Sequence, residues 1–315
     1  MRNRTPHLAA AAVAVCLVAL SCSKSNQRAT QTIPSNSSEP TIDLKVKWTP
    51  GKKVVLRLAI SSTSQMENPK TKKPIAQVTD MSWDYAINTL KQRDDGGHEV
   101  ELEFVATKME SKVGDRVYLS FDSHDASKET SDPITPALRK LVGAKLNYTF
   151  GPDNKLEKLG GYDDFMVRIA RGSKNSEMLK SMFNEDSLKM LCKWADGLPD
   201  HPVRPGDTWK NSTEMRVYGM AKIFIDGNFT FNGWEDRNGR KCAKLDFDGK
   251  ITGKGDDQAP FTIEKGKVHG TSWFDPEQGM LIGSDSDESM TVKIHQRGNT
   301  MSQLITQNVT MQLVE

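Results

Sequence analysis

Alternation of apolar and polar residues with a period of two runs through most of residues 53–313, and this pattern most restricts how the chain can fold. One face of residues 53–60 carries only apolar side chains, those of Val54, Leu56, Leu58 and Ile60. Residues 99–104 alternate in the same way, with a glutamate at every second position. Period two is typical of strands that are buried on one face and wet on the other. The pattern predicts a mainly β (α+β) protein, either a curved antiparallel sheet or two half-barrels.

Turn residues separate the alternating segments. The stretches 94–97 (Asp-Asp-Gly-Gly) and 238–239 (Asn-Gly) contain residues that readily adopt positive φ. Residues 221–233 keep one parity across Gly227, which predicts a single long strand, although Asp226-Gly227 would also suit a hairpin. Thr135 and Pro136 predict the N-cap and first residue of a two-turn helix over residues 136–142.

A helical insertion is expected over residues 161–198. Apolar residues recur there at helical spacing, namely Leu179, Met182, Phe183, Met190, Leu191 and Trp194, and Gly197 with Pro199 ends the pattern. Asn184 with Ser187 is suited to begin a second helix in this region. Four flexible or broad side chains, Met178, Met182, Met190 and Trp194, are interpreted either as ordinary core or as a pliable lining for a hydrophobic ligand.

The N-terminus has the pattern of a secretion signal. Arg2 and Arg4 precede an apolar run over residues 8–20, which is too short for the roughly 20 residues of a membrane-spanning helix. Residues 1–21 are therefore expected to be removed. Ser21-Cys22 resembles the bacterial lipobox, although Ala19 and Leu20 depart from its usual residues. The resemblance implies lipidation at Cys22, and the alternative is ordinary cleavage that leaves Cys22 as a thiol.

A polar segment follows the lipobox-like cysteine. Residues 23–40 contain Ile33 as their only large apolar residue, so they cannot bury enough surface to offset the entropy lost on ordering. Residues 22–43 are therefore expected to be a lipidated N-terminus and flexible tether, with the β-rich body at 44–315. A serine after the lipidated cysteine goes with sorting to the outer membrane in enteric bacteria. The resemblance implies a protein secreted across the inner membrane and anchored in the envelope, facing the periplasm.

The charge of the chain argues against a nucleic-acid partner, and the positions of its cysteines restrict which of them can form a disulfide. The formal charge of +2 is carried by Arg2 and Arg4 within an acid-free leader, so the remaining chain has no basic field and no nucleic-acid partner is expected. With Cys16 in the leader and Cys22 in the lipobox, Cys192 and Cys242 remain as a pair in an oxidising compartment. They are interpreted as a disulfide or as two small buried residues.

No motif for catalysis is present in the sequence. The five histidines beyond the leader are scattered singly, and no nucleophile elbow, zinc-binding helix or phosphate loop occurs. The acidic stretch 285–288 (Asp-Ser-Asp-Glu) lacks the glycine and distal glutamate of a calcium loop, and alternation places Asp285 and Asp287 on one wet strand face. We therefore expect a non-enzymatic protein with no cofactor and no bound metal.

Two short patterns occur twice, which predicts duplicated halves at 44–160 and 203–315. Each half opens on a Pro-Gly turn, at 50–51 and 205–206, and later contains a strand leading into an acidic turn, at 148–156 and 273–281. With residues 202–209 (Pro-Val-Arg-Pro-Gly-Asp-Thr-Trp) and the signal and tether, the chain resembles a family of uncharacterised bacterial lipoproteins that share a Pro-Val-x-x-Gly-Asp-x-Trp motif. That family has no assigned activity, so the resemblance does not indicate what the chain does. In shape alone, the chain is similar to periplasmic lipoprotein carriers, whose concave face holds acyl chains.

Two functions fit these features. The first is a membrane-anchored structural or interaction protein of the envelope, whose apolar residues fill a core and whose outer faces meet another protein. The alternative is a carrier-like module that holds a hydrophobic ligand or lipid on a concave face. We expect the first from the sequence, because burial accounts for every apolar stripe.

Overall fold

The computed structural model describes residues 38–67, 73–217, 221–255, 261–296 and 299–314. Its strands are β1 (Lys53–Glu67), β2 (Pro74–Gln92), β3 (His98–Val113), β4 (Arg116–Asp122), β5 (Lys145–Phe150), β6 (Leu156–Gly160), β7 (Thr208–Val217), β8 (Ala221–Arg237), β9 (Arg240–Gly255), β10 (Phe261–Asp275), β11 (Met280–Gln296) and β12 (Asn299–Leu313). The mainly β class with a small helical part, expected from the alternation, is confirmed.

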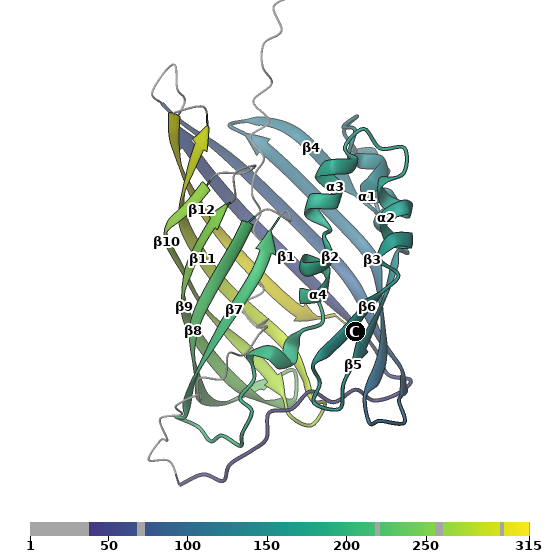
Figure 1. The fold of residues 1–315 in the computed structure, drawn as a ribbon, viewed down its shortest axis with the longest axis vertical. Helices are drawn as coiled ribbons and strands as arrows, with labels where there is room; N and C mark the ends of the chain where they lie inside the picture. Colours follow the sequence, from purple (N-terminus) through teal and green to yellow (C-terminus); the bar gives the residue numbers. More distant parts are fainter. Residues whose placement is uncertain (1–37, 68–72, 218–220, 256–260, 297–298, 315) are drawn as a thin grey trace, which may run out of the picture.

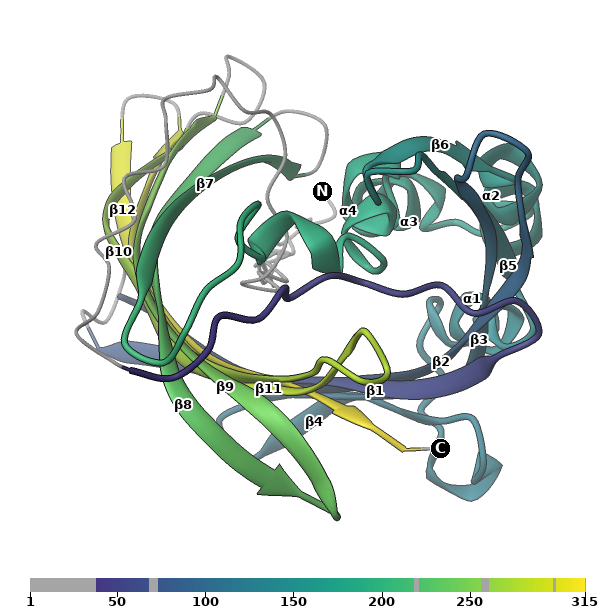
Figure 2. The ribbon, with the colours of Figure 1, turned by 90° about the horizontal axis from the view of Figure 1, so that it is seen from below.

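One antiparallel sheet contains all of these strands. Its order is β6-β5-β3-β2-β1-β12-β11-β10-β9-β8-β7, and β4 pairs with one end of β3 beyond β5. The sheet curves into a trough that is not closed into a barrel, because β6 and β7 are its two edges (Figures 1 and 2). The last strand, β12, lies between β1 and β11, so the C-terminal strand joins the two halves of the sheet.

Three of the helices lie inside the trough toward one side, and the fourth contacts both edge strands, β6 and β7. The helices are α1 (Thr135–Leu141), α2 (Tyr162–Ala170), α3 (Ser176–Met182) and α4 (Glu185–Met190), with the 3₁₀ turns η1 (Ala126–Lys128) and η2 (Trp194–Gly197). Phe165 of α2 and Phe183 after α3 pack on Phe104 of β3. Figure 2 shows α1, α2 and α3 beside β2, β3, β5 and β6, whereas β8–β12 curve around the opposite side.

A strap formed by residues 42–48 crosses one end of the trough (Figure 2). Ile42 bridges to Val203, and Leu44, Val46 and Trp48 are buried. The strap also contacts both halves of the sheet: the Lys47 amide donates to the Gly279 carbonyl (2.8 Å), and Trp48 stacks on Phe150. Contacts with the body thus begin before the expected boundary at residue 44, because the Trp234 indole donates to Glu39 (3.2 Å) and Ile42 bridges to Val203.

Several local expectations are confirmed. β8 is a single strand that passes through Gly227 without a turn, and Asn238-Gly239 has positive φ at both residues, as a tight hairpin requires. Asn184 caps α4 by accepting a hydrogen bond from the Ser187 amide (3.0 Å). Gly51 and Gly206 both have positive φ at the openings of the proposed halves. Duplication of residues 44–160 and 203–315 stays a prediction.

Two helix expectations were wrong in detail. The helix expected at 136–142 spans Thr135–Leu141, and its N-cap is Ile134, which has no polar side-chain atom. Thr135, the expected N-cap, donates its hydroxyl to the Thr130 carbonyl (3.2 Å) instead of capping the helix. The insertion over 161–198 is split into α2, α3, α4 and η2 rather than one or two helices. Gly172 with positive φ ends the first of these, and such breaks let each piece follow the curved sheet.

Candidate functional site

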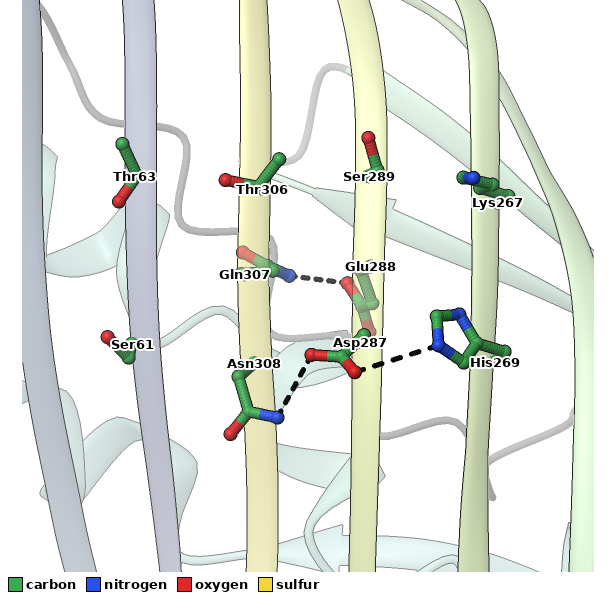
Figure 3. A pocket seen from close by; sticks show the side chains of 10 residues that line it. All are labelled: Ser61, Thr63, Lys267, His269, Asp287, Glu288, Ser289, Thr306, Gln307 and Asn308. Atoms are coloured by element: carbon green, nitrogen blue, oxygen red, sulfur yellow. Dashed lines mark hydrogen bonds and ion pairs between the residues drawn. The ribbon is translucent and has the colours of Figure 1, made fainter.

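A polar pocket of about 420 Å³ lies on the outer face of the sheet, over β1, β10, β11 and β12 (Figure 3). It is lined by Ser61, Thr63, Lys267, His269, Asp287, Glu288, Ser289, Thr306, Gln307 and Asn308. His269 Nε2 lies 3.6 Å from Asp287 Oδ2, and Asn308 Nδ2 donates to Asp287 Oδ1 (3.2 Å). Glu288 and Gln307 lie behind these groups and belong to the opposite face.

The outer pocket offers little for chemistry. Its exposed carboxylate, Asp287, is paired with a histidine and an amide, and the neighbouring Ser61 donates to Asp80 (2.6 Å). Within the part of the chain that the structure describes, no group of three or more His, Cys, Asp or Glu side chains is arranged to hold a metal ion. Asp285 and Asp287 are both exposed, as the alternation predicts for a solvated strand face.

The inner face carries a polar strip that crosses five strands in one register row. Strand pairing aligns Glu288 with Gln307, Gln307 with Ser62, Ser62 with Thr79, and Thr79 with Ser111. All five side chains are buried. The Gln307 amide donates to Glu288 Oε2, and the hydroxyls of Thr79 and Ser111 are hydrogen-bonded (3.2 Å). We call these five residues the inner polar strip.

Glu288 is the exceptional member of the inner polar strip. Its side chain is 2% exposed, and burial raises its pKa well above the usual range for a glutamate, opposed by the hydrogen bond from Gln307. Its second carboxyl oxygen, Oε1, is buried and has no hydrogen-bond partner among the described residues. Burying an unpaired carboxyl oxygen costs free energy, so a group that hydrogen-bonds this atom would be favourable here.

Beside the strip, the inner face of β7–β9 carries a row of buried aromatic side chains. Trp209, Phe229 and Phe247 form a neighbouring row across β7, β8 and β9, and successive ring centroids lie 5.8 and 5.7 Å apart. The row continues to Gly270 on β10, where a Cβ atom would lie only 2.6 Å from Phe247 Cζ. The Phe247 ring therefore lies across the glycine, along the sheet, instead of projecting into the trough.

The same arrangement occurs in the row of the inner polar strip. Beyond Glu288 that row continues through Val268 to Gly249 and Gly227. A Cβ atom on Gly249 would lie 3.1 Å from Val268 Cγ1, and one on Gly227 would lie 3.3 Å from Phe229 Cε2. Glycine at inner positions marks close approach of neighbouring chain. The wall next to Glu288 thus has few protruding side chains.

The four residues expected to line a ligand site are not alike in their surroundings. Met178 is 43% exposed, Met182 is half-buried against the core, and Met190 is buried. The surroundings of the Trp194 side chain lie outside what the structure describes. A lining made by these residues stays a prediction.

The two cysteines of the body have separate environments. Both thiols are buried and free. Burial raises the pKa of Cys192, which lies next to Tyr148, and raises that of Cys242 to about 11, near Asp275 and Arg240. Because buried neutral thiols are inert, these residues act as small core residues in the structure. Cys22 lies outside the described residues, and its lipidation stays a prediction.

The motif at residues 202–209 builds a corner of the fold. Asp207 is buried and accepts from the Arg204 amide (2.9 Å), while its carbonyl accepts from the Phe231 amide (2.9 Å). The Trp209 indole donates to the Gly197 carbonyl (3.1 Å), which ties η2 to β7. The motif is therefore structural in this chain.

Sequence reasoning missed the inner polar strip, although a signal for it existed. Glu288 shares the parity of Met290 and Val292, and Gln307 shares that of Ile305 and Val309. Two long polar side chains at apolar positions of separate strands could have indicated a buried polar pair. Their pairing depends on the register of β11 and β12, which the residues alone do not reveal.

Comparison with known proteins gives a family without an assigned role. The model of a family of unknown function, DUF6263, matches residues 95–295, which is more than half of the chain. No curated protein sequence matches significantly. Among the described residues, no helix is long and apolar enough to cross a membrane.

Similarities to solved structures are distant. Lipovitellin, solved in a study of lipid–protein interactions, is 9% identical over 85% of this chain with a TM-score of 0.46, and this chain spans about a quarter (26%) of it. A putative outer membrane lipoprotein-sorting protein domain from Vibrio parahaemolyticus is 8% identical, with 86% of this chain and 88% of that one covered and a TM-score of 0.16. These values do not establish a shared fold.

Proposed function

We propose that this chain, which belongs to the DUF6263 family of unknown function, is a non-enzymatic, lipid-anchored protein of the bacterial envelope that binds a hydrophobic ligand inside its trough. The leader, Ser21-Cys22 and the polar tether support lipid anchoring and location in the envelope. The buried apolar side chains on the inner face of β7–β10, on the side of the trough away from α1–α3, carry the proposal for the ligand.

Inner side chains of β9 and β10 lie along the sheet and do not project into the trough, which favours a ligand there. Helices that fill a trough need facing ridges to pack against. Phe247 and Val268 instead lie over Gly270 and Gly249 along the wall, which produces a flat apolar surface suited to an acyl chain. Hydrophobic surfaces with a few convergent polar groups are typical of small-molecule sites, and the inner polar strip supplies such groups.

A structural or interaction role is the second candidate. It is favoured by the outer face of the sheet, where rows of exposed or half-exposed carboxylates include Asp226, Asp246, Asp248, Asp285 and Asp287. Such a face would suit a basic partner protein. In that case the trough interior would be ordinary core.

The variants Val268→Trp and Lys267→Trp separate the two candidates. Val268 is an inner residue and Lys267 is its exposed neighbour on the outer face of β10. If the trough receives ligands, Val268→Trp has room to fold, melts cooperatively, and no longer enhances the fluorescence of N-phenyl-1-naphthylamine, while Lys267→Trp behaves like the wild type. If Val268→Trp fails to fold and Lys267→Trp folds, the interior is packed and the ligand-binding role is wrong.

A further inference from the structure

The position of the inner polar strip defines which kind of ligand the trough would hold. The strip lies on β11, β12, β1, β2 and β3, and Glu288 on β11 is its member nearest to the apolar inner residues of β7–β10. The aromatic row of Trp209, Phe229 and Phe247 lies in the next inner row of the sheet, two residues along each strand. The nearest members of the two sets, Glu288 on β11 and Phe247 on β9, are therefore separated by two residues along the strands and by two strand spacings, about 7 Å and about 10 Å. An amphipathic molecule would contact both.

The residue types in the strip indicate which polar head group of a lipid would be favoured. Its residues are a glutamate, a glutamine and three hydroxyl residues, with no cation among them to balance an anionic head. An ionised Glu288 would repel a carboxylate or phosphate. A protonated Glu288 would offer a donor and an acceptor, and a hydroxyl group on the ligand can both accept and donate. An uncharged hydroxyl head therefore satisfies Glu288 in either protonation state.

We propose, building on the ligand-binding role proposed above, that the inner polar strip recognises the uncharged, hydroxyl-bearing head of an acylated lipid such as a glyceride, with Glu288 Oε1 as the principal hydrogen-bonding atom. The acyl chain of that lipid lies along the aromatic row on β7–β9. Two observations support this assignment together: a buried carboxyl oxygen without a described partner, and its place in a row of polar residues beside the apolar wall.

The test compares two lipids that share one acyl chain. Monooleoylglycerol and oleate compete at neutral pH with N-phenyl-1-naphthylamine bound to the full chain. We expect monooleoylglycerol to displace the probe at a concentration at least about tenfold lower than oleate, because one hydrogen bond to a buried carboxyl group is worth that factor.

Variants assign the preference to the strip. Glu288→Leu is expected to reduce the preference to less than about threefold, whereas Glu288→Gln, which keeps a donor and an acceptor, retains most of it. The control is Asp287→Asn, the outer-face neighbour on β11, which should leave the preference unchanged. Cooperative melting of each variant confirms that it is folded.

The outcomes distinguish this inference from the function on which it rests. If both lipids displace the probe equally, or if folded Glu288→Leu keeps the preference, the head-group assignment is wrong and the ligand-binding role stands. If the probe does not bind the wild-type chain, or neither lipid displaces it, both are wrong.

Discussion

Among the described acidic residues, burial raises the pKa of two, Asp196 and Glu288. Glu288 lies on the inner face of β11, where only Gln307 compensates its carboxyl group with a described hydrogen bond. Asp196 lies in η2, and its pKa is raised to about 6 by desolvation, opposed by Lys193 and Lys155. Both groups cost the protein free energy when ionised at neutral pH. One belongs to the inner polar strip, and the other to η2, whose Gly197 carbonyl accepts a hydrogen bond from the Trp209 indole of the aromatic row.

Asp196 gives a pH prediction with a definite sign. Because its folded pKa of about 6 exceeds the ordinary value of 3.8, its contribution to stability is present below pH 3.8 and is lost as the pH rises through 6. We expect Asp196→Asn to be more stable than the wild type by about 2 kcal/mol at pH 7.5, and nearly equal to it at pH 4. Denaturant unfolding of both proteins at the two pH values measures this, and a difference that does not change with pH would contradict it.

At the level of single strands, Gly270 lets neighbouring chain approach more closely than a larger residue would. A Cβ atom on Gly270 would clash with the Asp285 carbonyl oxygen, the Phe247 ring and Ser286, because the strands approach closely there. Gly160, at the end of β6, has only ordinary contacts, with its nearest neighbour, the Asn147 carbonyl oxygen, at 3.6 Å. The two positions therefore differ in space although both belong to strands.

The substitution Gly270→Ala tests this difference, with Gly160→Ala as the matched control. We expect Gly270→Ala to lower the free energy of unfolding by about 2 kcal/mol, as overpacking of a close-packed site does, and Gly160→Ala to change it by less than about 0.5 kcal/mol. Thermal or urea unfolding of the two variants gives both values. Equal effects at the two positions would mean that the sheet relaxes around Gly270.

Features that depend on a few neighbouring residues could be predicted from the sequence, and features that depend on contacts between distant residues could not. The alternation in residues 53–60, the Asn238-Gly239 turn and the Asn184 cap each depend on a few neighbouring residues, and each is found as expected. The pairing of β1 with β12 joins residues some 250 positions apart, and no local pattern specifies it. The same limit applies to Glu288, because parity assigns a face to a residue but does not reveal what lies opposite that face.

At the scale of the whole molecule, the trough has two different sides and one crossed end. α1–α3 pack beside β2–β6, the apolar wall is formed by β7–β10, and the strap at 42–48 joins both sides through Val203, Gly279 and Phe150. The inner polar strip runs from Glu288 on β11, next to β10, to Ser111 on β3, on the side where the helices lie. A protein whose interior served only as core would have no need of an unpaired buried carboxyl oxygen at that position.

Native mass spectrometry of the mature chain, released from the envelope of its own host in mild detergent, shows whether the trough holds a ligand. We expect an additional non-covalent mass of a single lipid that is lost on denaturation, while the denatured chain begins at Cys22 and keeps covalently attached acyl groups. The Val268→Trp variant should keep the covalent groups and lack the additional mass. A wild-type chain that carries no non-covalent lipid in its native state would contradict the proposal that the trough is a ligand site.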